Sequence, residues 1–283
     1  MPDRTLTIHG VTVPRFLYGT AWKEDQTQRL TELAVERGFR GIDTANQRRH
    51  YHEAAVGQAI AAAIAQGLVV REDLFLQTKF TFRRGQDQRL PYDPEAPIPT
   101  QVEQSLASSL AHLGVAWVDS FLLHGPTTSV GLTPDDWAAW RAMEAIHDSG
   151  RARLLGLSNV TPEQLEGLWQ AARVRPRFVQ NRCFAALGWD RQVREFCAAH
   201  DVIYQGFSLL TANRQVLAAA EFAQIAARHH RTIPQIVFRF ALEVGMIPLT
   251  GTTAAEHMQA DLAVFDFCLQ PAEVAQIERL AAR

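Results

Sequence analysis

The chain has little of several features that mark particular classes of protein. Its 283 residues include only three cysteines, Cys183, Cys197 and Cys268, which lie far apart and without metal-ligand spacing. We therefore expect no disulfide framework and no metal, but buried thiols in a reducing compartment. The sequence has no apolar run long enough to cross a membrane, and its N-terminus shows no basic segment followed by an apolar one. These absences predict a soluble, unprocessed cytoplasmic protein that does not associate with membranes.

Strong charge of either sign is also missing. The formal net charge is −2 and the isoelectric point is near 6.6, so the chain has no overall field that would attract nucleic acid or an anionic membrane. A small-molecule ligand fits this balance better than a nucleic acid. No GxGxxG motif follows an apolar run, which removes support for a Rossmann-type nucleotide site. No exposed apolar stripe decides between a monomer and a homo-oligomer.

What the sequence does have is a regular alternation of short apolar runs with helical patterns. Residues 6–13 alternate apolar and polar side chains around Gly10, which predicts a small hairpin. Strands are then expected at 16–20, 41–44, 74–79, 118–124, 152–157, 178–180, 202–207 and 246–250, and helices at 26–37, 53–66, 100–113, 134–148, 162–172, 191–200, 218–229, 235–243 and 271–280. Eight such units without a Pro- or Gly-rich linker predict an α/β fold, a single (β/α)8 TIM barrel domain over residues 1–283. The N-terminal hairpin is expected to cap the barrel bottom.

Local signals support several of these elements. Thr133 and Thr161 each precede a proline and an acidic residue, and Thr232 stands two residues before Pro234. Each threonine is expected to cap the start of a helix. The segment 83–99 is a long polar insertion directly after a predicted strand, and we expect it to act as a lid.

Four ionisable residues stand late in strand-like runs or just after them: Asp43 in GFRGIDT, Tyr51 in RRHYHE, Lys79 in LFLQTKF and His124 in VDSFLLHGP. In a barrel the carboxyl ends of the strands meet at one mouth, so Asp43, Lys79 and His124 are expected to converge there. The alternative for each residue alone is structural, with Asp43 and Lys79 forming an ion pair and His124 buried in the core. Their joint placement favours a functional site.

The order and context of these residues resemble the aldo-keto reductase family. The segments GIDTA, QTKF, LHGP, GLSN and TGTT carry the resemblance in order along the whole chain. It implies NAD(P)H-dependent reduction of aldehydes or ketones to alcohols, with a small carbonyl compound as the substrate. Tyr51 would donate the proton, and Lys79, held by Asp43, would lower the pKa of that phenol. His124 would orient the carbonyl group.

Tyr51 departs from the usual family pattern. It lies eight residues after Asp43, which is farther than usual, because residues 47–50 lengthen the turn. Tyr51 remains the best candidate for the donor, and His50 or Tyr92 would substitute if the turn aims Tyr51 elsewhere. His50 and His52 together suggest a metal pair, but no third ligand is evident, so no metal is expected.

The resemblance also implies a cradle for the cofactor. The residues it assigns are Thr20, Ala21, Asp43, Ser158, Asn159, Gln180, Phe207, Ser208, Leu209, Thr250, Gly251, Thr252, His257 and Asp261. Phe207 stands where the family usually stacks a tyrosine on the nicotinamide. Leu249, Thr250 and His257 replace the usual lysine, serine and arginine around the adenosine 2′-phosphate. These replacements remove the usual charge-assisted contacts to the phosphate, so NADPH is expected from the resemblance and NADH is the alternative.

The expected substrate pocket and the rival functions complete the hypothesis. Trp22, Phe80, Phe82 and Phe184 are placed to line the pocket, although each is also suited to core packing.

The same hydride and proton chemistry suits reduction of an imine. A barrel aldolase or lyase would use Lys79 as a Schiff-base amine. A third alternative is a catalytically weak barrel that senses nicotinamide.

Overall fold

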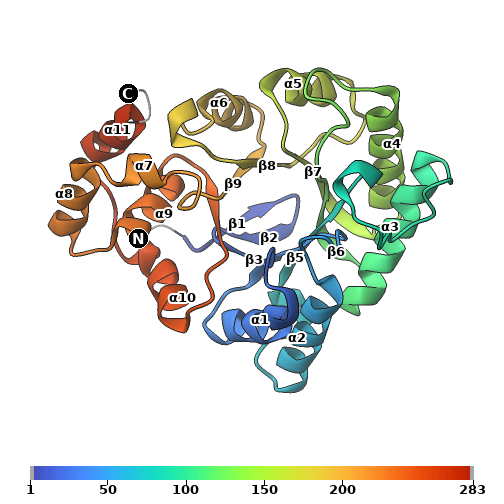
Figure 1. Ribbon diagram of the computed structural model, residues 1–283, viewed down its shortest axis with the longest axis horizontal. Helices are drawn as coiled ribbons and strands as arrows, with labels where there is room; N and C mark the ends of the chain where they lie inside the picture. The colour runs from blue at the N-terminus through green and yellow to red at the C-terminus, as the bar shows by residue number, and fades with distance from the viewer. Residues whose placement is uncertain (1–2, 281–283) are drawn as a thin grey trace.

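The computed structural model describes residues 3–280 and shows a closed barrel of parallel strands surrounded by helices (Figure 1). Its strands follow one another around the barrel in the order β10-β3-β4-β5-β6-β7-β8-β9. Their bounds are β3 Leu17–Gly19, β4 Gly41–Asp43, β5 Phe75–Phe80, β6 Val118–Leu123, β7 Ala152–Ser158, β8 Phe178–Arg182, β9 Ile203–Phe207 and β10 Ile247–Thr250. The expected (β/α)8 fold is confirmed.

The helices lie outside the barrel (Figure 1). Their bounds are α1 Thr27–Glu36, α2 Glu53–Ala65, α3 Ile98–Leu113, α4 Pro134–Asp148, α5 Pro162–Ala171, α6 Arg191–Ala199, α7 Arg214–Leu217, α8 Ala220–His229, α9 Ile233–Glu243, α10 Ala255–Leu262 and α11 Pro271–Leu280. The helix expected at 218–229 begins two residues later, at Ala220, because Ala219 has extended backbone. The short helix α7 precedes it. No helix within residues 3–280 has the length and apolar character that crossing a bilayer requires.

An antiparallel hairpin closes the end of the barrel opposite the mouth. It consists of β1 Thr5–Ile8 and β2 Val11–Pro14, joined by two residues that both have positive φ, His9 at 45° and Gly10 at 76°. Such a pair suits the right-handed twist of a tight hairpin. The apolar face of the hairpin packs against barrel side chains, among them Phe75. The predicted cap on the barrel bottom is confirmed.

The three predicted threonine caps are present. Thr133, Thr161 and Thr232 precede α4, α5 and α9, and the hydroxyl of each accepts from the backbone N–H three residues later. The side chain of that third residue closes each capping box by accepting from the threonine N–H. These helices therefore begin where local sequence chemistry predicts.

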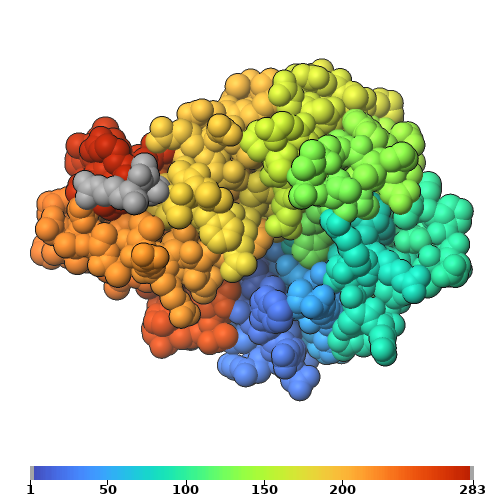
Figure 2. Space-filling view, turned by 45° about the horizontal axis from the view of Figure 1, so that its top comes forward, coloured from blue at the N-terminus to red at the C-terminus, as the bar shows by residue number. Residues whose placement is uncertain are grey.

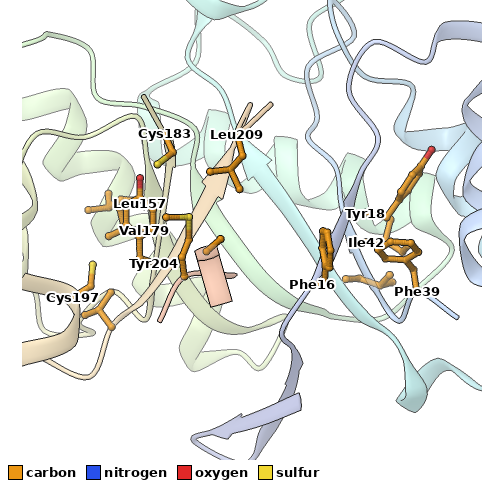
Figure 3. Close-up of a cluster of buried hydrophobic side chains, with 14 of the residues drawn as sticks. Phe16, Tyr18, Phe39, Ile42, Leu157, Val179, Cys183, Cys197, Tyr204 and Leu209 are labelled. Carbon is orange, nitrogen blue, oxygen red and sulfur yellow. The ribbon is translucent and has the colours of Figure 1, made fainter. Parts of the chain in front are cut away.

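Large apolar side chains fill the space between the strands and the helices. In Figure 3, Phe16, Tyr18, Phe39 and Ile42 pack on one side of the barrel, and a second group that includes Cys183, Cys197 and Tyr204 packs on the other. Burial raises the pKa of the Cys183 thiol to about 12, so this thiol is inert. The expectation that all three cysteines are buried is wrong, because Cys268 is exposed on the segment between α10 and α11.

The polar insertion packs against the rest of the chain. It begins with the short helix η3 (Arg83–Gly85) and ends as α3 starts at Ile98. Tyr92 is 6% exposed, and its hydroxyl donates to the Thr81 carbonyl at 2.8 Å. The side chain of Gln86 donates to the carbonyl oxygens of Asn46 and Thr81. The insertion thus contacts the lengthened turn that follows β4.

Candidate active site

A buried ion pair lies at the carboxyl ends of β4 and β5. Asp43 is the last residue of β4 and Lys79 lies one residue before the end of β5. Lys79 Nζ lies 2.8 and 2.7 Å from the two carboxylate oxygens of Asp43 and 2.9 Å from the Thr44 carbonyl. Burial lowers the pKa of Lys79, and the Asp43 charge opposes this shift. Three acceptors use all three protons of the ammonium, so Lys79 is a fixed cation and presents no free amine for a Schiff base.

Three glutamine side chains form a polar layer beside the Asp43 carboxylate. Gln77 and Gln180 donate to Asp43 Oδ1 at 2.7 and 2.9 Å, and both also donate to Gln205. The three amides lie on β5, β8 and β9, and each is 3% exposed or less. Because the buried carboxylate receives these hydrogen bonds in addition to the lysine, its charge is well compensated.

Tyr51 lies in the turn between β4 and α2. Its ring centroid is 5.3 Å from Lys79 Nζ and 6.0 Å from the ring centroid of His124. The lengthened turn therefore brings Tyr51 to the other three predicted residues. Burial and the Asp43 charge raise the pKa of Tyr51 above its ordinary value, which is opposite to the shift expected from Lys79. The first cause is burial of the phenol, and the negative charge of Asp43 adds to it.

His124 follows β6 and is an uncharged imidazole. Its Nδ1 lies 2.6 Å from the hydroxyl oxygen of Thr81, and its backbone N–H donates to Phe80. Burial, and then the positive charge of Lys79, lower the pKa of His124 to about 3. At neutral pH this ring is available as a hydrogen-bonding group but not as a cation.

A large cavity opens above these residues at the mouth of the barrel. Its volume is about 1170 Å³, which exceeds the usual range for one drug-sized ligand. Figure 2 shows a hollow between the blue and cyan loops of the first half of the chain and the yellow loops of the second. Asp43, Tyr51 and His124 line the cavity, whereas Lys79 lies beneath it.

Most of the expected cofactor residues face this cavity. Those that line it are Ala21, Asp43, Ser158, Asn159, Gln180, Phe207, Ser208, Leu209, Thr250 and Gly251. Three lining residues, Trp22, Asn159 and Ser208, have left-handed backbone with φ of 61°, 54° and 58°. Non-glycine residues in this conformation gather at ligand sites, where the surrounding fold compensates their strain.

Four expected cofactor residues do not line the cavity. Thr20 is buried and its hydroxyl donates to the Asp43 carbonyl. Thr252 and His257 lie beyond the lining, with their side chains 3.4 Å apart. Asp261 is buried on α10, and burial raises its pKa to about 6 while a hydrogen bond with Thr250 opposes the shift. These residues therefore stand behind or beside the loops that form the wall.

The aromatic residues predicted for the substrate pocket divide into two pairs. Trp22, which is 70% exposed, and Phe82 line the cavity. Phe80 and Phe184 do not. Phe80 is fully buried against Phe82, and the Phe184 ring lies below the Arg182 guanidinium at 5.4 Å. Phe80 alternates to the outer face of β5, away from the inward-facing Lys79.

The structure also brings forward cavity residues that the sequence did not single out. Thr81 was detectable in principle, because it stands two residues after Lys79 and so shares its face of the chain. Lys23 directly follows the Trp22 already assigned to the mouth, yet nothing local marks its role. Arg84 lines the cavity from the segment after β5, and Arg182 from the last position of β8. Their convergence depends on barrel closure, which no short motif encodes.

The described residues contain no group of side chains arranged as metal ligands. Within residues 3–280, no three His, Cys, Asp or Glu side chains are grouped to hold a metal ion. His50 Nδ1 is 2.9 Å from the Gln47 side-chain oxygen, and its ring packs against Trp22 with 3.9 Å between centroids and the ring planes tilted by 37°. His50 therefore belongs to the wall of the cavity.

The comparison with protein families agrees with this geometry. The model of the aldo/keto reductase family matches residues 16–282. The chain belongs to the aldo/keto reductase family. This aldo/keto reductase is 33% identical over 257 residues to an aldo-keto reductase of Mycobacterium tuberculosis (strain ATCC 25618 / H37Rv), covering 90% of this chain and 83% of the relative. The resemblance inferred from the motifs is thereby confirmed, and the protein is an oxidoreductase.

Solved structures share the same architecture. An aldo/keto reductase from Brucella melitensis superposes with a TM-score of 0.82 at 25% identity, covering 98% of each chain. A Bombyx mori aldo-keto reductase, solved in complex with NADP, gives a TM-score of 0.80 at 25% identity, covering 98% of this chain and 92% of the other. The barrel fold of these solved aldo-keto reductases is thus shared along nearly the whole of this chain.

Proposed function

We propose that this aldo/keto reductase reduces aldehydes or ketones to alcohols with NADPH, and that Tyr51 donates the proton. The observation that carries the proposal is the grouping of Tyr51, His124 and the Lys79–Asp43 pair at the floor of one large cavity. Carbonyl reduction needs a hydride at carbon and a proton at oxygen, and a phenol beside a fixed cation supplies the second.

The cavity wall fits a nicotinamide cofactor. The side-chain oxygens of Asn159 and Gln180 accept no hydrogen bond within residues 3–280, so they suit the N–H groups of a carboxamide. Phe207 offers an aromatic face for stacking. Lys23 reaches the cavity without a carboxylate partner in the same residues and suits a phosphate group. The bound cofactor supplies the hydride.

The raised pKa of Tyr51 is compatible with proton donation. The phenol stays protonated before the reaction because burial and Asp43 disfavour its anion. When the substrate oxygen takes the proton, the phenolate is left with the Lys79 ammonium 5.3 Å from its ring, and this attraction offsets part of the cost that burial and Asp43 impose on the anion. His124, neutral and partly exposed to the cavity, hydrogen-bonds the carbonyl oxygen and holds it near Tyr51.

The first prediction concerns Tyr51→Phe. Loss of the hydroxyl removes the proton donor, and we expect kcat to fall about 100- to 10,000-fold, the usual contribution of general acid catalysis. The measurement is the rate of NADPH oxidation with a panel of aldehydes, ketones and cyclic imines, repeated with NADH. Binding of NADPH, followed by quenching of tryptophan fluorescence, should persist in the variant.

Two further variants serve as controls. Tyr92→Phe removes a hydroxyl that donates to the Thr81 carbonyl and lies outside the cavity lining, and Gln86 still donates to that carbonyl, so the variant should lose far less activity than Tyr51→Phe. His50→Gln tests the other alternative donor. A Tyr51→Phe enzyme with wild-type turnover would contradict the assigned role, and collapse in His50→Gln alone would move the donor to His50. Cofactor binding without turnover of any substrate would favour a sensing function.

A further inference from the structure

We propose that Thr81 is a positioning residue that fixes the tautomer of His124, so that the imidazole presents Nε2–H to the carbonyl oxygen of the substrate. The inference rests on the proposed reduction and adds a residue to its machinery. A neutral histidine carries its single ring proton on either nitrogen, and only one of the two tautomers is able to donate from Nε2. The group bonded to Nδ1 therefore decides which nitrogen serves the substrate.

The contact between the two side chains is short and buried. Thr81 follows β5 and is 6% exposed, while His124 follows the neighbouring strand β6. Their Oγ1 and Nδ1 atoms are 2.6 Å apart. Both residues line the cavity that holds Tyr51. The contact thus joins the ends of two strands immediately beside the proposed site of reaction.

The direction of this hydrogen bond depends on whether the O–H group of Thr81 has an acceptor. Within residues 3–280, the Thr81 hydroxyl has no other partner than His124 Nδ1. If Nδ1 carried the proton, the threonine O–H would be left without an acceptor, which is costly at a buried position. The favoured arrangement has Thr81 donating to the lone pair of Nδ1. The ring proton then resides on Nε2.

The surrounding chain holds both partners in place. The Thr81 carbonyl accepts from the Tyr92 hydroxyl at 2.8 Å and from the Gln86 side chain at 3.3 Å. The backbone of His124 donates to Phe80 and accepts from Asn159 at 2.8 Å. Burial and Lys79 keep the ring uncharged, since they lower its pKa to about 3. The tautomer, rather than the charge, is therefore the variable that Thr81 controls.

Kinetics of Thr81→Val and Thr81→Ser provide the first test. Valine keeps the shape but loses the donor, and we expect kcat to fall roughly tenfold, the equivalent of one net hydrogen bond, with an unchanged dissociation constant for NADPH. Serine keeps the hydroxyl and should restore most of kcat. Thr31→Val is the matched control, since it removes a fully buried hydroxyl bonded to Thr27 on α1, remote from the cavity.

Direct observation of the tautomer provides a second test that needs no substrate. Long-range ¹H–¹⁵N correlation spectra of the chain labelled in its histidine rings distinguish Nδ1–H from Nε2–H, and His124→Gln identifies the signal. We expect Nε2–H in the wild type and in Thr81→Ser, and a mixture of tautomers in Thr81→Val.

Each of the following results would overturn the proposal: Nδ1–H in the wild type, an unaltered tautomer in Thr81→Val, or equal kcat in Thr81→Val and the wild type. The spectra report on Thr81 even if the enzyme reduces no carbonyl tested, so failure of this inference is distinguishable from failure of the proposed function. Loss of activity in Thr81→Ser as large as in Thr81→Val would also count against it, because the hydroxyl is retained.

Discussion

At the scale of single residues, the cavity holds Tyr51 and His124 in their uncharged forms. Burial is the first cause for both, raising the pKa of the phenol and lowering that of the imidazole. The Asp43 and Lys79 charges add to these shifts, each acting on one of the two rings. One buried ion pair therefore disfavours both the phenolate and the imidazolium before a substrate binds.

The histidine makes a testable contribution to the pH dependence of stability. In the unfolded chain His124 should titrate near its ordinary value of 6.5, but in the folded chain its pKa is about 3. The folded state thus binds this proton less readily. Its stabilising contribution is fully present above pH 6.5 and is lost as the pH falls toward 3, by up to about 1.4 kcal/mol per pH unit.

Denaturant unfolding of the wild type and His124→Gln between about pH 7 and pH 5 checks this expectation. The free energy of unfolding should fall more steeply with decreasing pH in the wild type than in the variant. The comparison of slopes removes the constant effect of the substitution on stability. Parallel curves for the two proteins would contradict the depressed pKa.

At the scale of elements, the lengthened turn after β4 and the insertion after β5 support each other. The Gln47 side chain donates to the Gly85 carbonyl at 2.6 Å, and the Gln86 side chain donates to the Asn46 carbonyl at 2.8 Å. Arg89 donates to the Arg48 carbonyl at 3.2 Å. Reciprocal bonds of this kind fix a turn that has no regular structure of its own. They place Tyr51 despite its greater distance from Asp43 along the chain.

We predict that Gln86→Met weakens this support. The substitution leaves the carbonyl groups of Asn46 and Thr81 without the amide donor, and such losses cost about 1–3 kcal/mol when the groups are buried. Hydrogen exchange followed by mass spectrometry should show faster exchange over residues 46–52, with a lower kcat. Gln88→Met is the control, because Gln88 is exposed in the same insertion. Equal exchange in the two variants would refute the coupling.

At the scale of the whole molecule, the cavity and the surface differ in charge. The chain carries a formal net charge of −2, yet the acidic residue that lines the cavity, Asp43, is paired with Lys79. Lys23, Arg84 and Arg182 line the same cavity without carboxylate partners within the described residues. The mouth of the barrel is therefore locally positive and suited to an anionic cofactor.

Binding of NADPH should accordingly depend on salt and on Lys23. We expect its dissociation constant to rise with ionic strength, because salt screens the attraction. Lys23→Met should raise it roughly tenfold, as expected for loss of a charge-assisted contact, and should flatten the salt dependence. Fluorescence titration measures both effects. Arg141→Gln removes an exposed cation outside the cavity and should bind NADPH like the wild type. If Arg141→Gln weakened NADPH binding as much as Lys23→Met, a local contact by Lys23 would be ruled out.

The sequence alone determined the order of strands and helices, the threonine caps and the residues at the strand ends. These features depend on local chemistry: apolar periodicity selects the element, and a threonine before a proline selects its start. Asp43, Lys79 and His124 were predictable because parallel strands bring their carboxyl ends to one edge.

Only the tertiary structure decided the rest. The upward shift in the pKa of Tyr51 depends on burial and on the nearby charge of Asp43, the partner of Lys79. Neither is a property of a short segment. The outward turn of Phe80, the exposure of Cys268 and the contact of Thr81 with His124 depend on side-chain direction in the folded state. The insertion and the turn meet because parallel pairing places the end of β4 beside β5. Local sequence sets which elements form, whereas burial and contacts between distant segments set what their side chains do.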